Sequence, residues 1–457
     1  MIHQYQNNGY YIVLDVNSGS VHAVDKIVYD VIPLFEQYKK EEIVEQLKEQ
    51  YQAEQIVEAY EEILELKKQG QLFTEDIYKD YIMDFKKRKT VVKALCLHIA
   101  HDCNLACKYC FAEEGEYHGR RALMSLEVGK KALDFLVAHS GNRRNLEVDF
   151  FGGEPLMNWD VVKKLVEYGR SLEEPYQKKF RFTLTTNGVL LNEEIMEFCN
   201  REMGNVVLSL DGRKEVHDWM RPCRTGTGSY DLVVPKFQKF VESRGQKNYY
   251  VRGTFTRKNL DFSKDVIHYA DLGFQLLSME PVVAAPEEEY AIRKEDLPQI
   301  FEEYDKLALE YIKRQKEGRG FQFFHFMLDL NQGPCVAKRL SGCGSGTEYL
   351  AVTPWGDFYP CHQFVGREEF LLGNVEDGIT KPSISDEFKL CNVYAKESCK
   401  NCFARFYCSG GCAANSYQFH NTITDVYEIG CEMERKRVEC AIMIKAALAE
   451  AEETGEE

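Results

Sequence analysis

The chain has 457 residues, of which 44% are hydrophobic and 12% aromatic, so a chain that stays disordered is excluded. Lys and Arg number 57 against 73 Asp and Glu, and the net charge of −16 argues against nucleic acid and anionic membranes as partners. The start, MIHQYQNN, shows no signal peptide, and no apolar run approaches the roughly 20 residues that span a bilayer. We therefore expect a cytoplasmic protein of about three domains.

Residues 1–78 are predicted to form a small α+β unit. Two strand-like runs lie at Tyr10–Val16 and Val21–Val24. Three helical patterns follow, at Lys26–Phe35, Glu41–Tyr51 and Gln55–Lys68, and Gly70 is a stop signal. The basic run at 86–89 is interpreted as a solvated linker.

Residues 90–315 alternate between strand-like and helical patterns, which favours parallel α/β units. The predicted strands are Ala94–Ile99, Leu146–Phe151, Phe180–Thr186, Val206–Leu210, Tyr249–Phe255 and Gln275–Val282. Six such units suit a partial barrel or an open sheet. In either architecture, the active site lies at the carboxyl ends of the strands.

The pattern changes after this region. Residues 316–334 are interpreted as a bridging segment, and residues 335–445 consist of short Gly- and Cys-rich segments with little periodicity. We expect this part to be held together by metal more than by an apolar core. The acidic tail, 446–457, is expected to be frayed.

The sixteen cysteines are unevenly placed, since only Cys96 precedes Cys103 and most lie from Cys335 onward. Disulfides are rare in the reducing cytoplasm, so clustered cysteines indicate metal ligation. Cysteines outside the clusters are interpreted as small buried hydrophobic residues, and these are Cys96, Cys199, Cys223 and Cys440.

The first cluster is the C-x3-C-x2-C run of Cys103, Cys107 and Cys110, directly after the first barrel strand. Three thiolates on a [4Fe–4S] cluster leave one iron open for a ligand. Zinc or buried thiols are the alternative. With Tyr109 before the last cysteine, this run resembles the radical S-adenosylmethionine (SAM) superfamily. The resemblance implies a partial (β/α)6 barrel, in which these cysteines are catalytic and hold the SAM-binding cluster.

Further strand ends resemble other motifs of that superfamily. Gly152-Gly153-Glu154-Pro155 follows the second strand and resembles the GGEP motif, whose backbone and glutamate hold the SAM amino group. Glycines let backbone approach a ligand closely, and a carboxylate pairs with an ammonium. The resemblance assigns further SAM contacts to Tyr109, Thr186, Asn187, Ser209 and Asp211, and Thr185 could face the same site. Arg221 is a candidate for the SAM carboxylate, with a surface ion pair as the alternative.

The C-terminal cysteines resemble the SPASM domain, which carries two auxiliary [4Fe–4S] clusters. Only five residues separate Cys402 from Cys408, which is too short for paired zinc knuckles. By resemblance, the distal cluster is held by Cys399, Cys402, Cys408 and Cys431. The proximal cluster is held by Cys343, Cys361 and Cys412, with Cys335 as a possible fourth ligand. If Cys335 does not bind, one iron is open for a substrate thiolate. Cys391 lies outside the pattern.

Position 362 departs from the best-known SPASM enzymes, the anaerobic sulfatase maturases. They carry an aspartate base after the cysteine that matches Cys361, and this chain has His362. The departure weakens an interpretation as an enzyme that oxidises alcohols or thiols. His362 is either a base of a different kind or a polar residue beside the cluster.

The N-terminal unit resembles, by pattern only, the PqqD-like recognition element of enzymes that modify ribosomal peptides. Such an element adds a leader peptide as a strand to an exposed sheet edge. A generic winged helix or structural cap is the alternative. The acidic character of this region could steer a basic leader, or it could merely solvate a helix face.

The whole layout resembles the SCIFF maturases, which form thioether crosslinks in a small Cys-rich peptide. The resemblance implies a 5′-deoxyadenosyl radical that removes a hydrogen from a threonine, a Cys–Thr thioether, and auxiliary clusters that take the surplus electron. The implied partners are a precursor peptide and a small reductant such as flavodoxin or ferredoxin. Two alternatives stay open. One is other SPASM chemistry, namely sulfatase maturation or C–C crosslinking, and the other is a non-enzymatic metal-binding scaffold.

Overall fold

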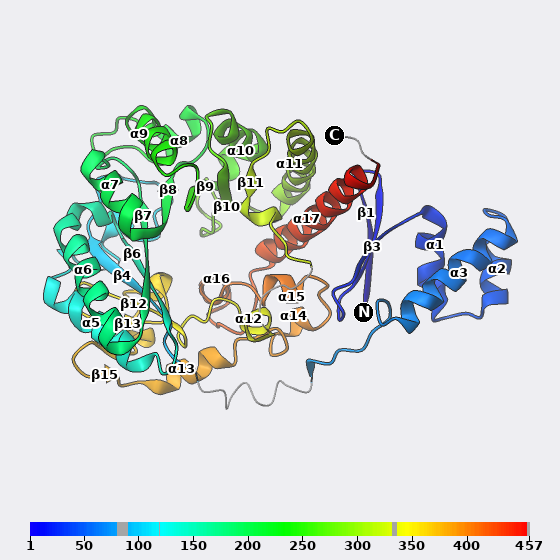
Figure 1. Ribbon diagram of the computed structural model, residues 1–457, viewed down its shortest axis with the longest axis horizontal. Coiled ribbons are helices and arrows are strands. Elements are labelled where there is room, and N and C mark those ends of the chain that lie inside the picture. The colour runs from blue at the N-terminus through cyan, green and yellow to red at the C-terminus, as the bar shows by residue number, and fades with distance from the viewer. Residues whose placement is uncertain (80–89, 118, 331–335, 455–457) are drawn as a thin grey trace.

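The computed structural model describes residues 1–79, 90–117, 119–330 and 336–454 (Figure 1). Its N-terminal unit is an antiparallel sheet in the order β1 (Ile2–Asn7), β2 (Tyr10–Asp15), β3 (Val21–Val24). The helices α1 (Lys26–Phe35), α2 (Lys40–Leu47) and α3 (Ala53–Lys68) follow. The sequence does not predict β1, because IHQYQN is polar and forms a strand only through its pairing with β2. The linker prediction at 86–89 falls outside the described residues.

The central domain contains the six predicted parallel strands, each with ends within three residues of the prediction. They are β4 (Ala94–His101), β6 (Asn145–Gly152), β7 (Lys179–Thr186), β8 (Met203–Ser209), β9 (Tyr249–Phe255) and β10 (Leu276–Pro281). They lie side by side in chain order and are parallel throughout. The short strand β5 (Ala122–Leu123) pairs with β4 in the antiparallel direction. The predicted fold class, an α/β partial barrel, is confirmed.

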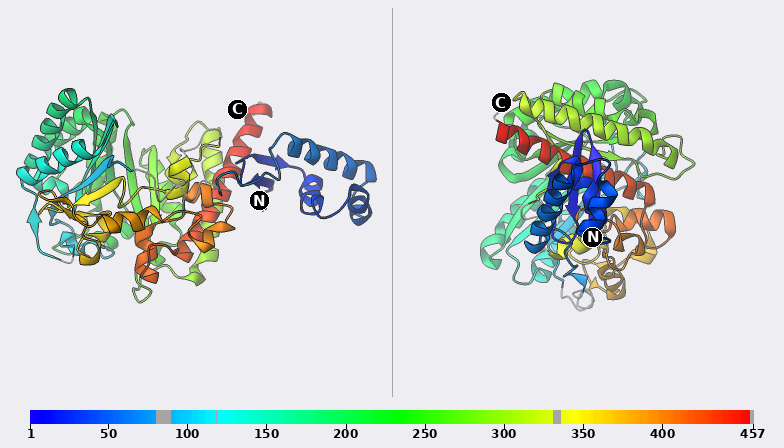
Figure 2. Two further views of the ribbon diagram at one scale, coloured as in Figure 1. Left: turned by 90° about the horizontal axis from the view of Figure 1, so that it is seen from below. Right: turned by 90° about the vertical axis from the view of Figure 1, so that its right-hand side faces the viewer.

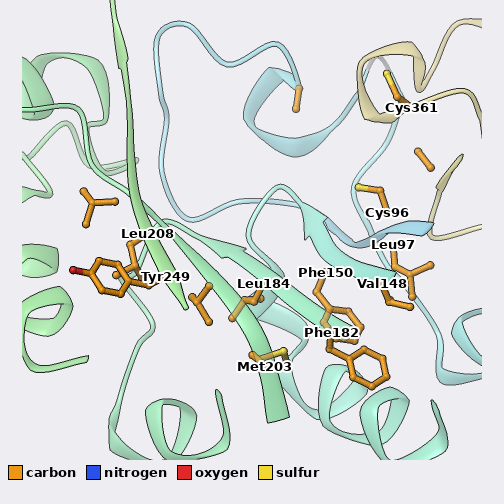
Figure 3. Packing of buried hydrophobic residues seen from close by; sticks show 14 of the residues in the cluster. Cys96, Leu97, Val148, Phe150, Phe182, Leu184, Met203, Leu208, Tyr249 and Cys361 are labelled. Carbon is orange, nitrogen blue, oxygen red and sulfur yellow. The ribbon is translucent and has the colours of Figure 1, made fainter. Parts of the chain in front are cut away.

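Helices cover one face of this sheet. They are α5 (Leu126–His139), α6 (Trp159–Tyr176), α7 (Glu193–Glu202), α8 (Lys214–Met220), α9 (Tyr230–Ser243), α10 (Phe262–Asp271) and α11 (Leu297–Lys316). Gly169 of α6 approaches β7 so closely that an added Cβ would lie 2.6 Å from the ring of Phe182. Figure 3 shows Phe150 and Phe182 on the helix-covered side of the sheet. Alternate strand residues therefore point to the opposite, inner face.

The sheet continues at both edges with residues outside the predicted barrel. At one edge β11 (Gln322–Phe323) pairs with β10, inside the segment predicted to be a bridge. At the other edge β12 (Tyr349–Val352) pairs with β4 in parallel. Antiparallel strands β13 (Asp357–Tyr359), β14 (Gly373–Asn374) and β15 (Gly378–Ile379) extend from β12.

The Cys-rich segment, which we expected metal to hold together more than an apolar core, does contribute side chains to an apolar core. Leu350, Val352 and Phe358 are fully or almost fully buried and belong to the same core as the barrel. The physical reason is the pairing of β12 with β4, which places their side chains against the barrel layer. The helices of this segment are α12 (Val336–Ser341), α13 (Pro382–Lys389), α14 (Glu397–Lys400), α15 (Arg405–Cys408), α16 (Ala413–His420) and α17 (Glu428–Thr454).

Helix α17 continues through most of the tail that was expected to be frayed, and Ala447 and Ala451 are buried. It lies between α11 and the N-terminal sheet, whereas α1 to α3 project away from the rest of the molecule (Figures 1 and 2). No helix among the described residues is long and apolar enough to cross a membrane.

The N-terminal sheet packs directly on the Cys-rich segment. Its Ile12 and Leu14 share an apolar cluster with Phe403 and Val438, while Val13 faces the unit's own helices. His3 stacks on Phe403 with ring centroids 3.5 Å apart. Two further polar contacts join the parts. The Tyr5 hydroxyl donates to the Glu439 carbonyl at 2.9 Å, and the buried Arg405 guanidinium pairs with Asp76 at 2.9 Å.

Candidate active site at the carboxyl ends of the strands

The loop that follows β4 carries Cys103, Cys107 and Cys110. Backbone hydrogen bonds from Ala106 to Pro222 and from Lys108 to Met220, both 2.9 Å long, hold this loop against the end of α8. Burial raises the pKa of Cys103 to about 11 and that of Cys107 to about 12, and nearby thiols add to both shifts. The three predicted ligands are therefore close neighbours. Without a cation, Cys103 and Cys107 stay protonated at pH 7.

The glycines of the second motif allow two backbones to meet. Gly152 has φ of +121°, and a Cβ on Gly153 would lie 2.1 Å from the carbonyl oxygen of Asp102. Because no Cβ is present at these two positions, the backbones come within hydrogen-bond distance. The Gly153 amide donates to the carbonyl of Ala100 at 2.7 Å, and the Glu154 amide donates to the carbonyl of Asp102 at 2.9 Å. The glycines therefore let the backbone at the end of β6 approach the cysteine loop closely.

Glu154 is fully buried at the end of β6. Its carboxylate accepts hydrogen bonds from the Leu156 amide at 3.0 Å, the Thr186 hydroxyl at 2.8 Å and the Asn187 amide at 2.8 Å. Burial nevertheless raises the pKa of this carboxyl to about 7. A carboxylate has about four acceptor positions, so one stays available for a cationic ligand.

The end of β7 joins Glu154 to the cysteine loop. The Asn187 side-chain amide donates to Asn104 Oδ1 at 2.7 Å and lies 3.6 Å from the sulfur of Cys103. Thr186 is buried and holds the turn through a hydrogen bond from the Gly188 amide. Thr185 is partly buried. One connected polar network thus joins the cysteine loop to the ends of β6 and β7.

Asp211 and Arg221 form a buried ion pair at the end of β8. Arg221 Nε donates to Asp211 Oδ2 at 2.9 Å, and the Tyr109 hydroxyl donates to the same oxygen at 2.6 Å. The Thr254 amide donates to Asp211 Oδ1 at 3.0 Å. Asp211 is fully buried and the Arg221 side chain only 13% exposed, so the alternative of a surface ion pair is wrong. The two terminal nitrogens of Arg221 are left for a carboxylate. Ser209 ends β8 beside this pair.

The C-terminal cysteines fall into two groups. The first group contains Cys361, Cys412 and Cys343. Burial raises the pKa of Cys361 above its usual range, and the charges of Cys412 and Cys343 raise it further. In the second group, burial and neighbouring charges raise the pKa of Cys408 to about 12 and that of Cys431 to about 11. The charges that act on Cys431 include those of its group partners Cys399 and Cys402.

Two other cysteines are not part of the ligand sets described above, although Cys391 lines the same pocket as Cys343. Cys335 falls outside the described residues. Cys391 donates its S–H to the carbonyl of Ile423 at 3.1 Å, which is the bond of a neutral thiol. No group of three or more His, Cys, Asp or Glu in the described parts of the chain is placed to hold a single metal ion.

His362 lies among aromatic rings, with Phe151 at 5.1 Å and Phe111 at 5.6 Å between ring centroids. Burial lowers its pKa to about 4, so the ring is neutral at pH 7. Sequence reasoning missed two further histidines, His98 and His101, which form a buried pair on β4 with ring nitrogens 3.0 Å apart. The signal was the spacing LHIAH directly before the cysteine loop.

Comparisons with known proteins agree with this geometry. The Radical SAM superfamily profile matches residues 97–244. A cysteine-type anaerobic sulfatase-maturating enzyme of Clostridium novyi is 25% identical over 72% of this chain and 90% of its own.

Two solved structures share the fold. Native anSMEcpe with bound AdoMet and Kp18Cys peptide is 20% identical, with a TM-score of 0.65 over 78% of this chain and 99% of its own. Streptococcus suis SuiB bound to precursor peptide SuiA is 14% identical, with a TM-score of 0.50 over 93% of this chain and 97% of its own. Residues 97–244 therefore match the radical SAM superfamily, and the chain is similar to the anaerobic sulfatase-maturating enzymes over most of their length.

Proposed function

We propose that this enzyme matures a Cys-rich precursor peptide by forming an intramolecular Cys–Thr thioether. The observation that carries the proposal is the N-terminal unit, whose strand β3 pairs only with β2 among the described residues. An open strand edge can take an extended leader peptide as a further strand. Because the same sheet packs on Phe403, between Cys402 and Cys408, a leader bound there would tether its core peptide to the catalytic part.

The residues fit the cofactors that the superfamily implies, a [4Fe–4S] cluster and SAM. Cys103, Cys107 and Cys110 would hold the cluster, because a cubane needs thiolates that reach three different irons and not one shared point. Glu154 would bind the ammonium of SAM and Arg221 its carboxylate. The fit is supported by the pKa of Glu154, which burial raises to about 7 and which a bound ammonium would lower again.

The two C-terminal cysteine groups would hold two auxiliary clusters. Cys399, Cys402, Cys408 and Cys431 would hold the distal one, and Cys343, Cys361 and Cys412 the proximal one. Burial raises the pKa of Cys361, Cys408 and Cys431, so these thiols are neutral without a metal and ligation would release their protons. Whether Cys335 completes the proximal set decides whether a substrate thiolate can bind there.

When bound, the cluster and SAM together supply a 5′-deoxyadenosyl radical that can remove a hydrogen atom from an unactivated carbon. The protein contributes position. Tyr109 and Asp211 hold the Arg221 guanidinium, and the bonds to Glu154 hold the ends of β6 and β7 together. The ring of His362, beside Phe111 and Phe151, can accept a hydrogen bond from a substrate thiol through its unprotonated nitrogen.

The decisive experiment uses the anaerobically reconstituted protein with SAM, a reductant and a synthetic Cys-rich precursor peptide that contains threonine and a leader segment. A thioether removes two hydrogens and one alkylatable thiol from the peptide, and fragmentation locates the crosslink between Cys and Thr. A C–C crosslink would leave every thiol alkylatable, and conversion of a single residue to an aldehyde would indicate sulfatase-type maturation. A protein that binds zinc and never cleaves SAM would refute the proposal and support the scaffold interpretation.

The leader peptide is tested by changing the peptide and not the protein. Deleting residues 1–75 would expose Phe403 and Val438, which the N-terminal sheet covers. A loss of processing in that deletion variant would therefore not distinguish lost leader binding from lost stability. Removing the leader from the peptide leaves this contact intact. We expect the KM for the leaderless peptide to rise at least tenfold, because the tethering is lost. Equal processing of both peptides would exclude leader recognition.

A further inference from the structure

Strand β9 carries an arginine on the inner face of the barrel sheet. Its neighbour Gly253 faces the helices, since an added Cβ there would lie 2.2 Å from the hydroxyl of Tyr269 on α10. Alternate residues of a strand point to opposite faces, so Arg252 and Thr254 face inward. The accessibilities agree, because Val251 and Phe255 are fully buried and the Arg252 side chain is 51% exposed.

Arg252 lies next to the residues expected to bind SAM. It is opposite Ser209 in the register of β8 and β9, and opposite Ser278 in the register of β9 and β10. The next inward residue, Thr254, donates its amide to Asp211. The positive charge of Arg252 also lowers the pKa of His362, which follows the predicted ligand Cys361. By its register and by the neighbouring Thr254–Asp211 bond, Arg252 therefore lies beside the residues proposed to bind SAM.

The guanidinium of Arg252 has no close partner of its own. Its nearest carboxylate oxygen is Glu280 Oε1 at 3.9 Å, beyond hydrogen-bond distance. Glu280 already has a cationic neighbour in Arg437, at 3.6 Å, and its Oε1 lies 3.4 Å from Nε2 of His325. No hydrogen bond joins the Arg252 guanidinium to any residue in the part of the chain that the structure describes. Apart from the long ion pair with Glu280, the described residues therefore leave the five N–H donors of this guanidinium without an acceptor.

An aromatic pair lies beside this arginine. Tyr250 is the preceding inward residue of β9, and its ring meets that of Phe324 edge to face at a centroid distance of 5.7 Å. The Phe324 side chain is 53% exposed, although it lies inside the molecule's largest domain. A free guanidinium beside an exposed phenyl ring offers a polar and an apolar contact at once, which is what a peptide segment requires.

We propose that Arg252 binds the substrate peptide at the reaction centre, by donating two N–H groups to an oxygen acceptor of the core segment while Phe324 packs against it. The acceptor is a side-chain carboxylate or a main-chain carbonyl, both of which match the planar fork of arginine. This inference rests on the proposed function, and it names the residue that would hold the reacting segment beside Ser209 and His362. Arg252 would bind substrate and neither cofactor.

Arg181 provides a matched control. It is also on an inward position, its side chain is 52% exposed, and its nearest carboxylate is Glu147 at 3.5 Å. It lies near the beginning of β7, away from the carboxyl ends of the strands. We would compare R252A, R252K and R181A with the unaltered protein. The probe is the leaderless core of the synthetic Cys-rich precursor peptide, because a bound leader would mask a weaker core contact.

We expect R252A to raise the KM for the leaderless core at least tenfold. The KM of R252K should lie between those of R252A and the unaltered protein, and the KM of R181A should stay within twofold of the unaltered protein. Iron content and SAM affinity of R252A should match the unaltered protein. If replacing the acidic core residues by their amides weakens binding to the unaltered protein but not to R252A, the acceptor is a carboxylate. If the amides bind as tightly as the acids, it is a main-chain carbonyl.

Two results would overturn the proposal. One is an R252A protein whose KM matches that of R181A, and the other is an R252A protein that loses SAM affinity, which would assign Arg252 to the cofactor site. Failure of the proposed function is distinguishable, because the unaltered protein would then cleave SAM and modify no peptide.

Discussion

We expect SAM binding to depend on pH through Glu154. Its pKa is raised to about 7 by burial, so only about 3% of this carboxyl is ionised at pH 5.5 and about 50% at pH 7. If the ionised form pairs with the ammonium of SAM, the apparent Kd should fall about fifteenfold over this range. The measurement ends at pH 7, because an α-amino group itself loses its proton near pH 7.7–8.0.

The same pKa affects the stability of the protein without SAM. A carboxyl whose pKa is higher in the folded state binds its proton more tightly there than in the unfolded chain. Its stabilising contribution to the free energy of unfolding is therefore complete below about pH 4.5 and is lost as the pH rises to about 7. The loss amounts to about 3 kcal/mol, since each unit of pKa corresponds to 1.36 kcal/mol. A bound ammonium offsets this loss.

Anaerobic calorimetric titration of SAM into the reconstituted protein, at three pH values between 5.5 and 7, measures this dependence. Glu154→Gln should bind SAM at least tenfold more weakly at pH 7, because a charge-assisted hydrogen bond is lost. Its apparent Kd should also not change between pH 5.5 and 7, because the amide does not titrate. The absorbance of the cluster serves as the control for intact iron. A Gln variant with the same slope as the unaltered protein would refute the role assigned to Glu154.

Three further predictions concern assembly. Replacing the three cysteines of the loop after β4 by alanine should lower iron from about twelve to about eight per chain, and a smaller loss would contradict three clusters. Gly153→Ala should lower Tm and iron content, because its Cβ would meet Asp102, whereas Gly119→Ala, with no atom nearer than 3.4 Å, should change neither. Arg405→Met leaves Asp76 unpaired and should cost about 3 kcal/mol in denaturant unfolding. A change below about 1 kcal/mol would show that this ion pair is not what attaches the N-terminal unit.

The sequence alone predicted the elements whose signals are local. The six barrel strands were recognisable because their apolar runs are bounded by turn residues and alternate with helical patterns. The cysteine spacing and the polar residues at the strand ends also lie within short stretches, so Cys103, Glu154 and Asp211 could be assigned to one end of the sheet. Parallel strands bring their carboxyl ends to the same edge, whatever their separation in the chain.

Tertiary structure decided everything that depends on partners distant in sequence. Strand β1 is polar and forms only by pairing with β2, and α17 extends through an acidic tail because Ala447 and Ala451 find a buried surface. The burial of the Asp211–Arg221 pair and the unpartnered guanidinium of Arg252 depend on which strand face each residue occupies. A one-residue change of register would reverse that face, and register is set by packing across the whole sheet. Sequence therefore determines the chemistry available at the strand ends, and folding determines which groups neutralise one another and which are left to bind a ligand.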